Sequence, residues 1–195
     1  PEILEIRPLI KGKEKDCEYT FDYNLSRIVC DGHTVRSVFA NTETVLVEGK
    51  GKDLSIRLNL HPAPVFDHCV ELQNKDGRHY VIIAKYAAKV RALVYAIKGK
   101  LEIHQSFKGG EYLPQKEKPV SEVTAVPDEN GDILVAIQEI ENNSRPVIMV
   151  NYKFDKCLRN NNRAFEKFLA KFGPVGSEYE EFQKHLAYIL WISTV

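Results

Sequence analysis

The sequence lacks the features that mark several classes of protein. Its 27 lysines and arginines are balanced by 27 aspartates and glutamates, so the formal net charge is zero. No block of like charges is present to attract nucleic acid or anionic lipid. The longest apolar run, residues 186–192, is far shorter than a membrane span. We therefore expect neither a nucleic-acid partner nor insertion into a membrane.

The sequence also lacks the recognisable motifs that bind metals, bind phosphate or activate a nucleophile. The four cysteines, Cys17, Cys30, Cys69 and Cys157, lack the close spacing of a zinc site or a redox pair. Their even number permits disulfides without implying them, so the compartment stays open. No strand carries a His-x-His pair, no glycine-rich loop opens a helix, and no Gly-x-Ser-x-Gly elbow occurs. We expect no metal and no cofactor, and we assign no catalytic residue.

The two ends of the sequence are unusual for a complete protein. The chain begins at Pro1 without an initiator methionine, its only methionine is Met149, and it stops at Val195 inside an apolar stretch. These features predict a piece of a longer polypeptide.

Alternating hydrophobicity dominates residues 2–152, which is typical of half-buried β-strands. Turn residues recur about every ten positions, which favours an antiparallel β-sandwich of about ten to twelve strands over β-α-β units. Residues 74–77 and 98–100 each predict the loop of a β-hairpin. The fold class is therefore mainly β.

Helical spacing replaces this pattern near the C-terminal end. Asparagines at 160–162 offer N-cap oxygens, and Gly-Pro at 173–174 ends the apolar periodicity, which predicts a helix over 162–172. Residues 177–180 have the pattern of a capping box, which predicts a second helix. We expect a β-sandwich domain over 1–154, and a helical linker over 155–195 that begins a further helical domain.

The second half of the last helix is apolar on every side, and such a helix needs partners all round. A β-sandwich covers only one face. We therefore predict that Tyr188 and Trp191 lie at an interface with protein outside this chain. A terminal helix that lies in a groove of the sandwich, or that forms a dimer, is the alternative.

Three aromatic residues, Tyr19, Phe21 and Tyr23, alternate along one predicted strand and share one of its faces. Aromatic rings in a row can stack on the apolar faces of sugars. They can equally fill the core of a sandwich, and core packing is the favoured interpretation because most such stripes face inward. These residues remain the candidates for substrate binding.

The C-terminal residues carry a family resemblance. Residues 187–195 read Ala-x-x-Leu-Trp-x-x-Thr-Val, which resembles the first barrel helix of six-hairpin glycosidases such as processing α-glucosidase-like and trehalase-like enzymes. These enzymes have an N-terminal β-sandwich of the supersandwich type, linker helices and an (α/α)6 catalytic barrel. The resemblance implies that the acid and base lie in the barrel, and that this chain packs on that barrel as its partner.

The sequence therefore predicts an accessory N-terminal β-sandwich domain of a glycoside hydrolase that acts on oligosaccharides and is not catalytic by itself. Two alternatives stay open. One is a free-standing carbohydrate-binding module that uses Tyr19, Phe21 and Tyr23. The other is an interaction domain whose last helix docks on another protein.

Overall fold

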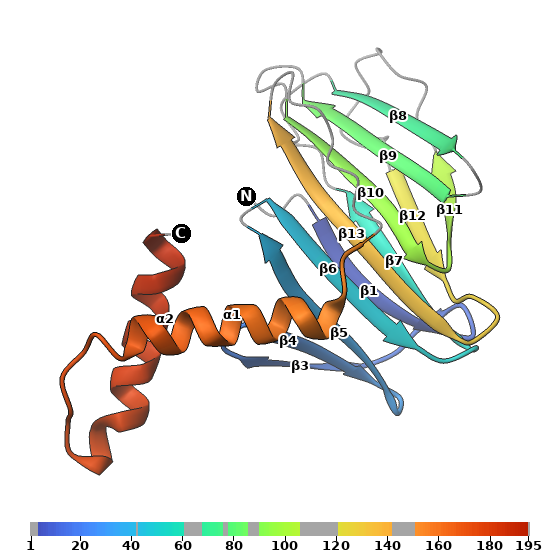
Figure 1. Cartoon of the computed structure of the whole chain (residues 1–195). Helices are drawn as coiled ribbons and strands as arrows, with labels where there is room; N and C mark the ends of the chain where they lie inside the picture. Colours follow the sequence, from blue (N-terminus) through green and yellow to red (C-terminus); the bar gives the residue numbers. More distant parts are fainter. Residues whose placement is uncertain are drawn as a thin grey trace.

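The computed structural model describes residues 4–41, 43–60, 68–75, 78–85, 90–105, 121–141 and 151–194. Within these ranges, thirteen strands precede two α-helices (Figure 1). The strands are β1 (Leu4–Ile10), β2 (Lys13–Glu14), β3 (Cys17–Asp22), β4 (Leu25–Cys30), β5 (His33–Asn41), β6 (Thr44–Lys50), β7 (Leu54–Leu60), β8 (His68–Lys75), β9 (Arg78–Lys85), β10 (Val90–Lys98), β11 (Lys100–Gln105), β12 (Ser121–Val126) and β13 (Asp132–Glu141). The helices are α1 (Phe154–Leu169) and α2 (Glu180–Thr194).

The strands form two antiparallel sheets. One has five strands in the order β11-β12-β7-β1-β2, and the other has eight in the order β3-β4-β5-β6-β13-β10-β9-β8. Figure 1 shows the sheets facing each other, with α1 lying across β5 on the outer side of the larger sheet. The predicted antiparallel β-sandwich followed by two helices is confirmed.

Alternating apolar side chains form the core between the sheets. Leu54, Ile56 and Leu58 of β7 are fully buried, and they belong to the same cluster as Val47 of β6 and Val135 of β13. Complete burial of such a side chain contributes about 1.5–3 kcal/mol. The alternation of apolar residues in the sequence therefore arises because every second side chain faces the core between the sheets.

A second apolar cluster lies on the outer face of the larger sheet, beneath α1. Leu46 of β6, Tyr95 of β10 and Leu134 of β13 pack there with Phe154, the first residue of α1. The central strands of the larger sheet are therefore buried on both faces. This explains why consecutive residues of β13, and not only alternate ones, are apolar and buried.

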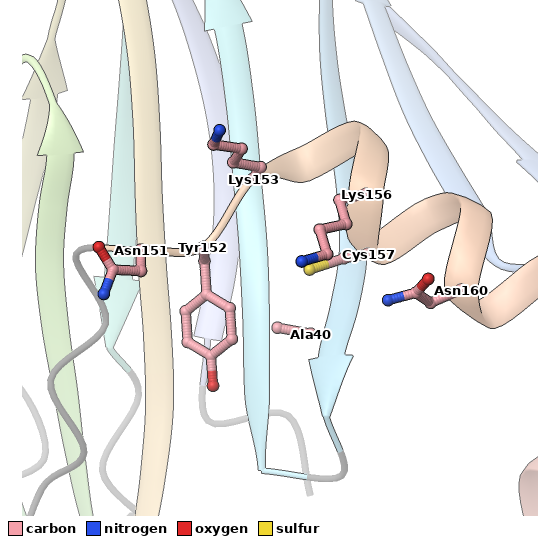
Figure 2. A pocket seen from close by; sticks show the side chains of 7 residues that line it. All are labelled: Ala40, Asn151, Tyr152, Lys153, Lys156, Cys157 and Asn160. Carbon is pink, nitrogen blue, oxygen red and sulfur yellow. The ribbon is translucent and has the colours of Figure 1, made fainter.

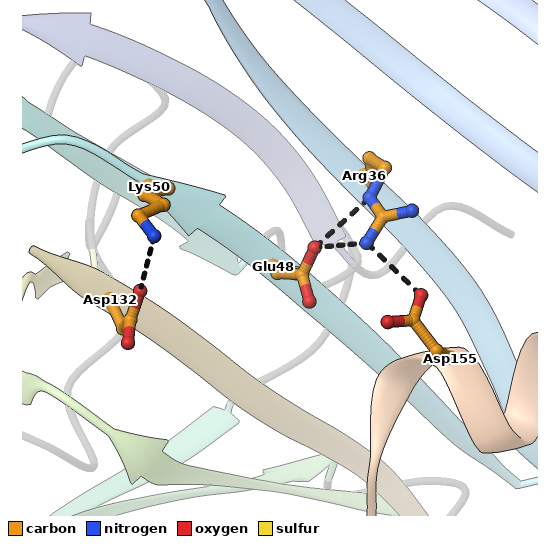
Figure 3. Close-up of polar contacts among 5 residues, drawn as sticks. All are labelled: Arg36, Glu48, Lys50, Asp132 and Asp155. Atoms are coloured by element: carbon orange, nitrogen blue, oxygen red, sulfur yellow. Dashed lines mark hydrogen bonds and ion pairs between the residues drawn. The ribbon is translucent and has the colours of Figure 1, made fainter.

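Charged groups fix the first turn of α1 to the sheet (Figure 3). The Arg36 side chain donates through Nε to Glu48 Oε1 at 3.0 Å and through Nη2 to Asp155 Oδ1 at 3.4 Å. The same guanidinium lies 4.4 Å from the centre of the Phe154 ring, which is the geometry of a cation–π contact. Arg36 thus joins two strands to the helix.

The two predicted hairpins have different outcomes. Strands β8 and β9 pair in register, with Lys75 opposite Arg78, which confirms the first hairpin; its loop, 76–77, lies outside the described residues. The second prediction is wrong, because β10 pairs in the larger sheet whereas β11 pairs with β12 in the smaller one. The chain instead passes between sheets at Gly99, where φ is 88° and a Cβ would lie 2.3 Å from the Val126 carbonyl oxygen.

Both predicted helices exist, but they begin elsewhere. Helix α1 starts at Phe154, eight positions ahead of the predicted start, so the asparagines at 160–162 lie inside it. The burial of the Phe154 side chain favours the earlier start of the helix, and this tertiary contact outweighs the preference of asparagine for the N-cap position. A 3-10 turn, Ser177–Tyr179, precedes α2 and has Gly176 at its N-cap, so Ser177 does not take the predicted cap position. No helix within the described ranges is long and apolar enough to cross a membrane.

Candidate functional site

Four aromatic side chains meet where the β3–β4 hairpin contacts the helices. The Phe165 ring of α1 stacks on Tyr23 with 5.6 Å between ring centroids, and Tyr188 of α2 lies edge-on to both rings at 5.4 and 5.3 Å. Trp191 lies 5.5 Å from Phe165. We call these four residues the junction cluster. Within the described residues, the ring contacts among these four side chains connect α2 to α1 and to the β3–β4 turn.

Polar contacts reinforce the junction cluster around Tyr23. The Tyr188 hydroxyl donates to the Tyr23 carbonyl oxygen at 2.7 Å, and the Tyr23 hydroxyl donates to Glu181 Oε2 at 3.2 Å. The Lys184 ammonium lies 4.4 Å from the centre of the Tyr23 ring. Burial raises the pKa of Tyr188, while burial and then the hydrogen bond to Glu181 raise the pKa of Tyr23. Both phenols therefore remain neutral donors at physiological pH.

The remaining surface of α2 is largely uncovered within the part of the chain that the structure describes. Ala187 is its only buried residue there, and Tyr188 and Trp191 are half-buried in the junction cluster. Five other apolar side chains are between 43% and 63% exposed: Phe182, Leu186, Ile189, Leu190 and Ile192. The last helix thus has one side against α1 and the β3–β4 turn, and several apolar side chains in solvent.

Two of the predicted sugar-stacking residues lie together and the third does not. Tyr19 and Phe21 are 60% and 80% exposed on β3, on the same face as Cys17, which packs against the core. Tyr23 lies beyond the strand, in a turn with φ of 51°, inside the junction cluster. The favoured interpretation of this stripe as core is wrong for Tyr19 and Phe21, whereas Tyr23 packs among other aromatic rings. Among the described residues, the smaller sheet has five strands against eight, and every residue of β3 after Cys17 is exposed.

Strand pairing adds residues that the sequence pattern did not reveal. Ser26 lies between Phe21 and Ser37 across three adjacent strands, and Phe39 follows two residues after Ser37 on the same face. Phe39 is 58% exposed. We call Tyr19, Phe21, Ser26, Ser37 and Phe39 the aromatic face. Phe39 fits the same alternation, but only the strand order places it on the same sheet face as Phe21, with β4 between their strands.

A cavity of about 290 Å³ lies beside the first turns of α1 (Figure 2). It is lined by Ala40, Asn151, Tyr152, Lys153, Lys156, Cys157 and Asn160. Its lysines and amides suit a polar neutral or anionic molecule. Burial raises the pKa of the Cys157 thiol, and since the thiolate is the nucleophile, this cysteine is poorly reactive. The cavity therefore offers binding groups without an activated catalytic one.

A second cavity of about 290 Å³ lies against the junction cluster, between the β3–β4 hairpin and the helices. Its lining combines the Asp22 and Glu166 carboxylates with Arg27 and Lys184. The two signs of charge are balanced, so this cavity does not select for a cation or an anion. In the described ranges, no three histidine, cysteine or acidic side chains gather as metal ligands.

Comparison with known proteins identifies no family for this chain. No protein-family model matches it, and no curated protein matches it. Among solved structures, one described as a kojibiose phosphorylase from the human microbiome aligns with a TM-score of 0.26 and 11% sequence identity. The alignment covers 94% of this chain and 27% of that protein.

Proposed function

We propose that this chain is an accessory β-sandwich domain of a glycoside hydrolase, and that α2 docks on a helical catalytic domain of the same polypeptide. The observation that carries the proposal is the exposed apolar surface of α2. In this assignment the sandwich positions the catalytic domain and performs no chemistry itself.

The amount of uncovered apolar surface supports a docking role. Leu186, Ile189 and Leu190 are each more than two-fifths exposed, and no charged residue occurs between 186 and 192. Complete burial of one such side chain contributes about 1.5–3 kcal/mol of stabilising free energy, and an exposed side chain lacks this contribution. Contiguous apolar patches on soluble proteins mark sites of interaction.

The spacing of these residues favours a helical occupant. Leu186 and Leu190 are four positions apart, and Ile189 is three from Leu186, so their side chains form ridges along the helix. Such ridges fit into the grooves of a neighbouring helix. The resemblance of residues 187–195 to a first barrel helix supports the same occupant.

The attachment of α2 supports a fixed orientation for this surface. The junction cluster holds one side of the helix against the hairpin, and Gln183 Nε2 donates to the Gly173 carbonyl at 2.7 Å. A helix held this way presents its opposite side in a defined direction, which lowers the entropic cost of docking.

Paired substitutions test the proposal. We expect Leu186→Gln with Leu190→Gln to lower the melting temperature of a polypeptide extended past Val195 by several degrees. The same double variant should change the isolated chain by less than about 0.5 kcal/mol, as is usual for surface positions. Val175→Gln, in the exposed connection between the helices, is the matched control and should have no effect in either form.

Two results would contradict the proposal. One is a coding sequence that stops directly after Val195 instead of continuing into a helical region with acidic motifs. The other is self-association of the chain in sedimentation that the double variant abolishes, because α2 would then serve a dimer.

Carbohydrate binding at the aromatic face is a second candidate, favoured by the exposure of Tyr19 and Phe21. Their side chains are about 6.5–7 Å apart along the strand, and each ring can stack on the apolar face of a sugar. Ser26 lies beside Phe21, Ser37 lies beside Ser26, and both supply hydroxyl groups for hydrogen bonds. The face contains no charged residue, which suits a neutral glycan.

Calorimetry against a panel of neutral oligosaccharides tests this candidate. We expect Phe21→Ala to weaken binding about tenfold, equivalent to roughly 1.4 kcal/mol. Tyr179→Ala removes an exposed aromatic ring outside the aromatic face and should leave binding unchanged. The candidate fails when no oligosaccharide binds, or when Phe21→Ala binds as tightly as the original chain.

A further inference from the structure

Cys17 and Cys30 lie directly opposite each other on β3 and β4. On its other side, Cys30 pairs with His33 across a two-residue turn, in which Asp31 and Gly32 have φ of 48° and 75°. The pair that flanks such a turn exchanges backbone hydrogen bonds. The N–H and C=O of Cys30 therefore point towards β5, and Cys17–Cys30 is a non-hydrogen-bonded pair.

The β3–β4 turn leads to the same assignment. Asp22 and Leu25 flank its two-residue loop and form the hydrogen-bonded pair. Bonded and non-bonded pairs alternate along the ladder, so Cys17–Cys30, the sixth pair when Asp22–Leu25 is counted as the first, is non-bonded. In such a pair the Cα atoms are about 4.5 Å apart, within the usual range for a disulfide of about 4.4–6.8 Å. Both side chains project from the same face.

We propose that Cys17 and Cys30 are a redox-active pair that forms an intramolecular disulfide across this hairpin. The oxidant is a small disulfide such as oxidised glutathione. The Cys17 thiolate attacks one of its sulfurs, forms a mixed disulfide and releases one glutathione thiolate. The Cys30 thiolate then attacks the Cys17 sulfur and releases the second glutathione. The two protons lost by the cysteines end on the two glutathione thiols, so atoms and electrons balance.

Access and acidity assign the order of these steps. Cys17 is half-buried whereas Cys30 is 1% exposed, so an external disulfide meets Cys17 first. Burial, together with the hydrogen bond and charge of Cys30, raises the pKa of Cys17 to about 11; Arg7 opposes this rise and Asp16 adds to it. The thiolate is scarce at neutral pH, so exchange is slow there and becomes faster as the pH rises.

The disulfide would secure an exposed edge of the sandwich. Among the described strands, β3 is the last one of the larger sheet and pairs with β4 alone. Cys17 is its first residue, and Tyr19 and Phe21 follow on the same face. Oxidation would therefore hold the strand that carries Tyr19 and Phe21 of the aromatic face. This inference stands independently of the proposed docking of α2.

Peptide mapping under native conditions tests the pair. The full chain is incubated with oxidised glutathione, remaining thiols are alkylated, and the protein is digested with trypsin without reductant. Trypsin cleaves after Lys15, Arg27 and Arg36, so the disulfide links peptides 16–27 and 28–36. We expect this linked species, lighter than the sum of its peptides by two hydrogen atoms.

Variants separate the pair from other thiols. Cys17→Ser should abolish the linked species, whereas Cys157→Ser, which removes the other described free cysteine, should retain it. Oxidation should raise the melting temperature of the original chain by on the order of 5 °C and leave Cys17→Ser unchanged. The rate of linkage should rise about tenfold per pH unit from pH 7 to 9. Recovery of both cysteines alkylated, or linked only to glutathione, would overturn the proposal.

Discussion

The two helices use their apolar residues in opposite ways. Helix α1 is rich in charged residues, yet Phe154 and Phe165 are each only 3% exposed because they lie over the sheet and the hairpin. Helix α2 is more apolar, yet Ala187 is its only buried residue among those described. Hydrophobicity therefore does not measure how firmly each helix is attached. A few well-placed contacts attach α1, whereas α2 retains apolar surface that the sandwich does not use.

The largest effect expected is the loss of the ring that both helices share. Phe165→Ala removes a buried side chain that contacts Tyr23, Tyr188 and Trp191, and should lower the free energy of unfolding by about 3–5 kcal/mol. Urea denaturation measures the loss, and Trp191 fluorescence should shift to longer wavelength. Phe182→Ala, on the exposed side of α2, should cost less than about 0.5 kcal/mol. Equal losses in the free energy of unfolding for the two variants would contradict this contrast, because Phe182 of α2 would then contribute as much as the buried Phe165 of α1.

A smaller effect is expected at the first turn of α1. Glu48→Gln removes the charge that faces Arg36 and should lower the free energy of unfolding by about 1 kcal/mol, because both side chains are roughly 30% exposed. Asp155→Asn should cost less, since the Asp155 side chain is 68% exposed. Urea denaturation of both variants measures the difference. A larger loss for Asp155→Asn would mean that the helix end, and not the strand pair, positions Arg36.

A last effect, similar in size to that of Glu48→Gln, concerns the hydrogen bond that holds α2 to the hairpin. Because the pKa of Tyr188 is raised in the folded chain, the unfolded chain loses this proton first, near pH 10. The contribution of neutral Tyr188 to the free energy of unfolding is therefore complete below pH 10. It is lost as the pH rises towards the pKa of Tyr188 in the folded chain. Tyr188→Phe should cost about 1 kcal/mol at pH 7 and flatten this decline.

Urea midpoints measured between pH 8 and 11 check this prediction. Tyr19→Phe serves as the control, because that hydroxyl lies on an exposed residue outside the junction cluster. A pH profile that is the same for Tyr188→Phe and the original chain would exclude Tyr188 as the source of the decline.

The β-rich fold and the helical end could be read from local patterns, because alternation and helical spacing are properties of neighbouring residues. The path of the chain could not. Lys98–Lys100 has the composition of a hairpin loop, yet Gly99 carries the chain from one sheet to the other. Which strand a segment pairs with depends on partners far along the chain, and a short loop does not specify them.

The candidate surfaces show the same division. Tyr19, Phe21, Tyr188 and Trp191 stand out by residue type and spacing alone. The addition of Phe39, the transfer of Tyr23 to the junction cluster and the pairing of Cys17 with Cys30 all required strand order and register. No spacing rule joins cysteines thirteen positions apart, whereas one hairpin places them face to face.

The sequence by itself determined that this chain is a β-rich protein of balanced charge, with an apolar C-terminal helix, because these features follow from composition and local periodicity. Only the tertiary structure decided which apolar residues are buried. Among the described strands, five lie opposite a sheet of eight, and the aromatic rings of Tyr19 and Phe21 on β3 are exposed. Burial depends on what lies opposite a side chain, and that is a property of the assembled sheets.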